Sequence, residues 1–135
     1  MTSSSGFRPP GPLGRGARGV ALAFLVSGTV HLVRPRVFEP IVPRALPARP
    51  VVLWSGVAEL ACAVGMLTPR TRRPAGLVSA ALLVVVFPAN VQMAVDSVGA
   101  ARRRPTRGRL ARAGITVARL PLQWPLVRWA AGAGR

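Results

Sequence analysis

One stretch of the chain constrains its fold more than any other: the run from Ala75 to Val95, which contains no charged side chain. At about 1.5 Å of helical rise per residue, this run is long enough to cross a hydrocarbon core of roughly 30 Å. Its second half carries Pro88, Asn90 and Gln92, where a segment needing only lipid solubility would contain more leucine. The sequence therefore predicts a membrane-spanning helix with a polar end.

The apolar residues of the remaining chain also fall in blocks, whereas soluble helices show interrupted stripes. Half of the 135 residues are hydrophobic and the mean hydropathy is +0.39. Further spans are predicted at 17–33, 51–68 and 113–131. The last of these is the weakest, because two arginines and two prolines interrupt it. We expect an all-α integral membrane four-helix bundle over residues 17–131, between a disordered N-terminal tail at 1–16 and a C-terminal tail at 132–135.

The segments between the blocks predict how the helices connect. Residues 34–50 contain five prolines and cannot form one long helix. We expect a short amphipathic segment at the membrane surface, with apolar side chains in the interface and arginines at the lipid phosphates. The turn after residue 68 is too short for a domain, which predicts an antiparallel hairpin, and residues 102–112 read as a basic loop. The apolar side chains of the amphipathic segment are Val37, Phe38, Ile41, Val42 and Leu46, and its arginines are Arg36, Arg44 and Arg49.

The net charge of +16 would ordinarily suggest a nucleic-acid partner. Stacking aromatic residues are few, however, and the arginines lie between apolar blocks, so the pattern favours a lipid bilayer and no nucleic acid. All nineteen basic residues are arginine, which, with abundant Ala, Gly and Pro, is typical of a GC-rich bacterial genome. We therefore expect a multi-pass protein of a bacterial inner membrane.

The distribution of arginine predicts the orientation in that membrane. The first and third connections carry ten arginines, against six around the N-terminal segment and the second connection. Positive residues are enriched on the cytoplasmic side, so the first and third connections are predicted to be cytoplasmic.

The chain lacks the common signatures of redox cofactors. The single cysteine, Cys62, excludes an internal disulfide, a CxxC couple and a zinc cluster within one chain, and we expect it in helix packing. The sequence also lacks a dinucleotide-binding glycine loop and a pair of haem ligands on facing spans. No metal or haem is indicated, and autonomous redox catalysis is not expected. Gly28, Gly56 and Gly65 are predicted to allow helices to approach closely.

Four segments occur in the order GTVHLVRPRVFEPIVPRALP, SGVAELACAVGMLTPRTRRPAG, VFPANVQMA and RLPLQWPLVRWA. Together, over roughly residues 25–131, they resemble the DoxX family of small four-helix bacterial membrane proteins, although the connection at 102–112 is longer and more arginine-rich than expected for that family. The resemblance implies a membrane-embedded bundle associated with redox or quinone-linked systems, as a subunit or partner of a membrane oxidoreductase. In that class of function, a polar cluster within the bundle binds a quinone or a similar small molecule. The alternative is a non-catalytic membrane protein that scaffolds or stabilises a partner.

The candidate site consists of the polar residues within the predicted spans, because such residues usually face a bundle interior or a cavity. Helical rise, counted from the first and third connections, places four of them about 3–12 Å from the same side of the bundle. Three pairs are four residues apart and so share a helix face: Ser27 with His31, Ser55 with Glu59, and Arg119 with Gln123. The sequence predicts an intramembrane polar cluster of His31, Glu59, Asn90, Arg119 and Gln123.

Each residue of the cluster also has a structural interpretation. Glu59 and Arg119 are expected to form an interhelical ion pair, since either charge alone in lipid is costly. His31 either bonds a carbonyl at a helix end or handles a proton or contacts a quinone. Asn90 is expected to bond backbone groups freed by the nearby proline. Gln92 lies about 200° from Asn90 around the helix, so both cannot face inward.

Overall fold

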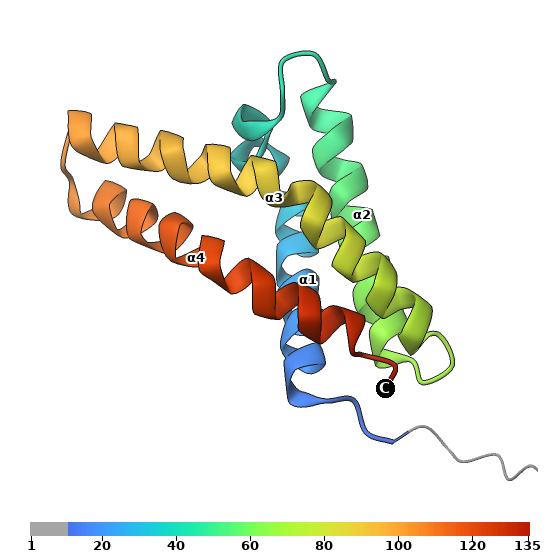
Figure 1. Cartoon of the computed structure of the whole chain (residues 1–135). Helices are drawn as coiled ribbons and strands as arrows, with labels where there is room; N and C mark the ends of the chain where they lie inside the picture. Colours follow the sequence, from blue (N-terminus) through green and yellow to red (C-terminus); the bar gives the residue numbers. More distant parts are fainter. Residues whose placement is uncertain (1–10) are drawn as a thin grey trace, which may run out of the picture.

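The structure, a computed structural model, describes residues 11–135, and all of its regular secondary structure over that range is helical (Figure 1). No β-strand occurs among these residues, so the all-α prediction is confirmed for them. Much of the predicted N-terminal tail, residues 1–10, lies outside the described range. The elements are α1 (Arg15–Val33), the 3-10 helices η1 (Pro35–Val37) and η2 (Glu39–Ile41), α2 (Ala48–Leu67), α3 (Arg72–Arg103) and α4 (Arg107–Ala131).

Helices α1 and α2 cross in direct backbone contact. A Cβ atom built on Gly28 would lie 2.8 Å from the carbonyl oxygen of Gly56, and one on Gly56 would lie 2.9 Å from that of Gly28. A Cβ on Gly65 of α2 would lie 2.7 Å from the Cβ of Ala75 at the start of α3. The expectation that these three glycines permit close helix approach is confirmed.

Helices α3 and α4 form the other extensively packed pair, and they are longer than predicted. The expected basic loop at 102–112 is wrong, because α3 continues to Arg103 and α4 starts at Arg107. Arginine favours helix, so the break comes only where Pro105 forces the preceding residue, Arg104, into an extended conformation with φ −147° and ψ 94°. Thr106 then caps α4, its hydroxyl accepting the Arg109 N–H at 3.3 Å. In Figure 1 this arginine-rich hairpin tip extends beyond α1 and α2.

The two pairs are joined at the end of the molecule that holds the α2–α3 turn and the C-terminus (Figure 1). Arg72 donates hydrogen bonds to the carbonyl oxygens of Gly11, at 2.7 Å, and Met66, at 3.2 Å. Leu13 is buried in the hydrophobic core beside Met66 and Ala133. The chain is therefore packed from residue 11 onward, four residues before α1 begins.

The segment between α1 and α2 forms no long helix, as its prolines predict. Its prolines divide it into the two 3-10 helices and an irregular stretch over 42–47. Phe38, Ile41, Val42 and Leu46 line a cavity against α2 and α3. The short turns fold the segment back over the helices, although Leu46 remains 49% exposed. The position of the segment at the membrane surface stays a prediction.

Polar side chains are buried and large apolar side chains are exposed over much of the molecule. Glu59 is 6% exposed and Ser79 is fully buried, whereas Val85 is 74% and Trp54 72% exposed. Three of the described helices, α1, α2 and α3, are long and apolar enough to cross a membrane by length and composition. Helix α4 is not among them, and its five arginines account for its low hydropathy.

Candidate functional site

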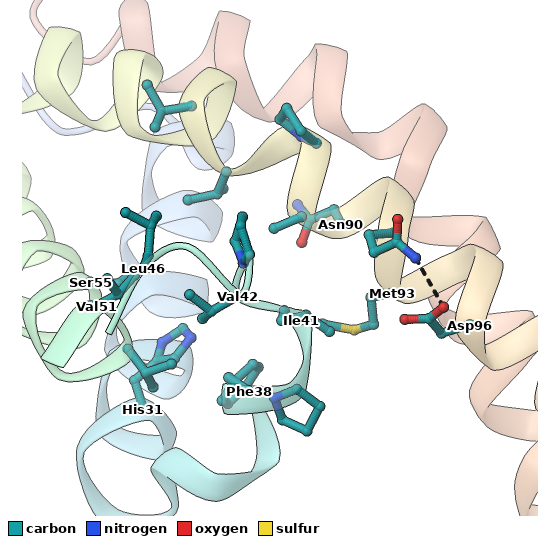
Figure 2. Close-up of a pocket in the computed structure, with 18 of the residues that line it drawn as sticks. His31, Phe38, Ile41, Val42, Leu46, Val51, Ser55, Asn90, Met93 and Asp96 are labelled. Atoms are coloured by element: carbon teal, nitrogen blue, oxygen red, sulfur yellow. Dashed lines mark hydrogen bonds between the residues drawn. The ribbon is translucent and has the colours of Figure 1, made fainter. Parts of the chain in front are cut away.

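A cavity of about 680 Å³ lies between α2, α3 and the connection from η1 to α2. Figure 2 shows its wall: Asn90, Met93 and Asp96 come from α3, and His31 and Phe38 come from α1 and the connection. The lining is predominantly aliphatic. Four of the five predicted site residues lie on this wall, namely His31, Glu59, Asn90 and Arg119.

Glu59 pairs with histidine and not with arginine. The Oε2 atom of Glu59 lies 3.3 Å from Nδ1 of His31, and both side chains are about nine-tenths buried. Among residues 11–135, this is the carboxylate's only ion pair, so the expected Glu59–Arg119 pair is wrong. Arg119 is exposed on α4 and reaches the same cavity without meeting the carboxylate. Helix α1 already supplies a basic partner at the α1–α2 crossing, whereas α4 packs chiefly on α3.

Two further contacts position the imidazole of His31. The hydroxyl oxygen of Ser27, one turn earlier in α1, lies 3.5 Å from Nδ1, so these two residues share a helix face as expected. The ring of Phe38 lies 4.0 Å from the imidazole, centroid to centroid, at an interplanar angle of 42°. The aromatic side chain from the connection thus covers the histidine at the end of α1.

The glycine crossing brings the histidine and the carboxylate together. Gly28 and Gly56 each lie three residues before His31 and Glu59 respectively, so the backbones touch within one helical turn of the pair. A Cβ on Gly56 would lie 2.8 Å from the Cβ of His31. Any larger residue at either glycine position would push His31 and Glu59 apart.

Asn90 points inward but has no protein partner for its amide nitrogen. The side chain is 8% exposed, and its Nδ2 atom is buried without a hydrogen bond. The amide that bonds the backbone near Pro88 comes from α4, where Gln123 donates to the carbonyl oxygen of Leu83. The predicted bond of Asn90 to backbone freed by Pro88 is not formed. Gln123, which does not line the cavity, bonds the carbonyl of Leu83, one residue before the Val84 carbonyl that Pro88 leaves free. Gln92 is exposed and donates to Asp96 at 2.9 Å, so only one of the two α3 amides is buried, as expected.

The wall supplied by the α1–α2 connection is the part of the site that sequence reasoning missed. The sequence predicts Phe38, Ile41, Val42 and Leu46 in the membrane interface and does not indicate that they line a cavity. Five closely spaced prolines are the signal that could have placed them, since a segment broken so often turns back on itself instead of extending.

The cavity contains one buried hydrogen-bond donor and one buried acceptor that a ligand could use. Asn90 Nδ2 and Glu59 Oε2 are both buried without a hydrogen bond, because the 3.3 Å contact of the carboxylate with His31 lacks hydrogen-bond geometry. A buried polar group without a partner costs roughly 1–3 kcal/mol. Among residues 11–135, no three His, Cys, Asp or Glu side chains are placed to hold a metal ion. The wall is suited to an apolar molecule with polar oxygens.

Comparison with known proteins identifies the family to which the chain belongs. No curated protein sequence and no solved structure matches the chain. The family model described as a domain of unknown function, DUF8561, matches residues 20–133. That range includes His31, Glu59, Asn90, Arg119 and Gln123. The chain belongs to the DUF8561 family, and the cavity lies within the family domain.

Proposed function

We propose that this chain is an integral membrane protein whose cavity binds a quinone or a similar lipophilic ring compound, as a subunit or partner of a membrane oxidoreductase. The resemblance to DoxX proteins supports the choice of a quinone, since it implies a redox-linked membrane setting. The aliphatic wall and the buried polar groups of the cavity support a ligand of that chemistry.

Insertion of all four α-helices in a bacterial inner membrane is part of this proposal. It is supported by the length and composition of α1, α2 and α3, and by the exposure of Leu22, Trp54, Val85 and Ile115, one on each helix. Such large exposed apolar surface is expected against lipid and unfavourable against water. Helix α4 crosses in this arrangement as the partner of α3, with the arginine-rich tip of the hairpin outside the hydrocarbon region.

The observation that carries the ligand proposal is that two buried atoms on an apolar wall, Asn90 Nδ2 and Glu59 Oε2, have no hydrogen bond. Asn90 Nδ2 would donate to a carbonyl oxygen of a bound quinone. Glu59 Oε2 would accept from the hydroxyl of the reduced form, while His31 holds the carboxylate in place at 3.3 Å. A volume of about 680 Å³ lies within the roughly 300–1,000 Å³ typical of small-molecule sites.

The proposal is tested with full-length protein purified in mild detergent. Solvent extraction followed by chromatography should recover a quinone from the purified protein, and stripped protein should bind a benzoquinone without a side chain. The Asn90→Leu variant should bind this benzoquinone about tenfold more weakly, since one hydrogen bond from a buried donor is lost.

Gln92→Leu is the matched control, because it replaces an amide on the same helix and the same cavity wall. The N–H of Gln92 is already donated to Asp96, so binding should change by less than about twofold. Equal losses in both variants would contradict the role of Asn90. If no quinone is retained or bound while a partner protein co-purifies, the chain is instead a non-catalytic scaffold.

A further inference from the structure

A second cavity of about 570 Å³ lies next to the first, between α1 on one side and α3 and α4 on the other. Its lining is apolar except for Ser27, Glu59 and Arg119. Leu22 and Val26, on the outer face of α1, form part of it and are 60% and 66% exposed. The second cavity therefore opens on the apolar exterior of the molecule.

The two cavities meet at four shared residues. Phe38, Glu59, Val86 and Arg119 line both, so these four residues, called the neck below, lie between the two cavities. Two of these side chains are apolar and two are charged, and the Oε2 atom of Glu59 is buried there without a hydrogen bond. Beyond the neck, the second cavity is lined by the aliphatic side chains of Leu82, Leu83 and Leu126.

We infer that the two cavities form one site for an amphiphilic ligand, with a polar ring in the first cavity and a long apolar chain passing the neck into the second. This inference rests on the proposed function and specifies its ligand class. The two buried atoms without a hydrogen bond, Asn90 Nδ2 and Glu59 Oε2, lie on the ring side or at the neck. Apart from the neck residues, the only polar side chain that lines the second cavity is that of Ser27. A second polar group on the ligand would therefore find few hydrogen-bond partners there. The apolar chain of a ligand that emerged between Leu22 and Val26 would continue directly into lipid. The volume of the second cavity therefore does not limit the length of that ligand chain.

The experiment compares two probes on the full-length protein in mild detergent: a benzoquinone without a side chain, and the same ring carrying a decyl chain. Ala23 lines only the second cavity and is exposed on α1. In Ala23→Trp, the indole should occupy the path of the chain. Affinity for the decyl probe should fall at least about tenfold, while affinity for the ring alone should change less than about twofold.

Ala61→Trp is the matched control, since Ala61 is an exposed alanine on α2 that lines neither cavity. Binding of both probes should be unchanged in this variant. If Ala23→Trp changes the affinity for both probes equally, or for neither, the decyl chain of the ligand does not occupy the second cavity. The inference is then overturned, while the proposed function stands. If wild-type protein binds neither probe, the proposed function fails, and the inference with it. Retained binding of the ring alone also establishes that the variant is folded.

Discussion

Replacing Gly28 by alanine should loosen the crossing on which the His31–Glu59 contact depends. The new Cβ would lie 2.8 Å from the carbonyl oxygen of Gly56 and 2.9 Å from Cγ of Leu60. Ordinary contact begins at 3.4 Å, so α1 and α2 must separate by about 0.6 Å at this point. A backbone carbonyl within a helix cannot rotate away, and Cγ of Leu60 lies near the backbone end of its side chain. The separation must therefore come from movement of the helices.

The energetic cost follows from two opposing effects. Overpacking of a close contact typically costs about 1–3 kcal/mol, whereas alanine favours a helix over glycine by up to about 1 kcal/mol. We expect Gly28→Ala to lower the free energy of unfolding by about 1 kcal/mol. The 3.3 Å distance between His31 Nδ1 and Glu59 Oε2 should lengthen as well, since both residues lie within a turn of the crossing.

Unfolding of the purified protein by a denaturing detergent, followed by circular dichroism, measures this change. Gly19→Ala is the control in the same helix, because a Cβ on Gly19 would meet no atom within 4 Å. This control should be as stable as wild type or slightly more stable, since only the helix preference of alanine acts. If Gly28→Ala proves as stable as Gly19→Ala, the two backbones are not in contact and the account of the crossing is refuted.

Three other predictions concern the site and its setting. Gln123→Leu should lower the free energy of unfolding in detergent by about 0.6 kcal/mol, the average for interhelical hydrogen bonds in membranes, and by no more than about 1.7 kcal/mol. Asn90→Leu should not lower it, because the amide nitrogen of Asn90 bonds no protein group. Double-mutant cycles should show stronger coupling between Glu59 and His31 than between Glu59 and Arg119, and the reverse order would contradict the observed pair. Reporter fusions should place the α3–α4 turn in the cytoplasm and the C-terminus outside, since most arginines lie on the first and third connections. The opposite pattern of reporter activity would reject that orientation.

The positions of the helices follow from the sequence because they depend on local chemistry. The uncharged run at 75–95 lies inside α3, and the prolines at 35 and 105 fall where helices have ended. The extent of α3 and α4 was underestimated, because a cluster of arginines resembles a loop in a hydropathy pattern although arginine is a good helix former. Hydropathy predicts which residues avoid water and does not by itself predict where a helix ends.

The sequence also determined which residues could form a site, because few polar side chains interrupt the apolar blocks. Depth along a helix is the only coordinate that a count of residues supplies. By helical rise, Arg119 lies about 3 Å and His31 about 9 Å from Glu59 in depth, so depth alone favours Arg119, whereas the structure pairs Glu59 with His31. The choice between them depends on how far apart the helices lie and how each is rotated about its axis. Those quantities are fixed by contacts between distant segments, above all the backbone contact of Gly28 with Gly56.

Packing between distant segments also decides which of the two buried amides bonds a neighbouring helix and how the cavity forms. Asn90 and Gln123 are equally polar in sequence, yet only Gln123 faces a carbonyl on a neighbouring helix, and Asn90 faces the cavity. The wall over His31 forms because the proline-broken connection folds back against α2 and α3. The prolines within residues 34–50 predict that the segment turns back, and they do not specify which helices it packs against. Local sequence thus determined the helices and the polar candidates, whereas helix crossing and rotation, which are set by long-range packing, decided the partners.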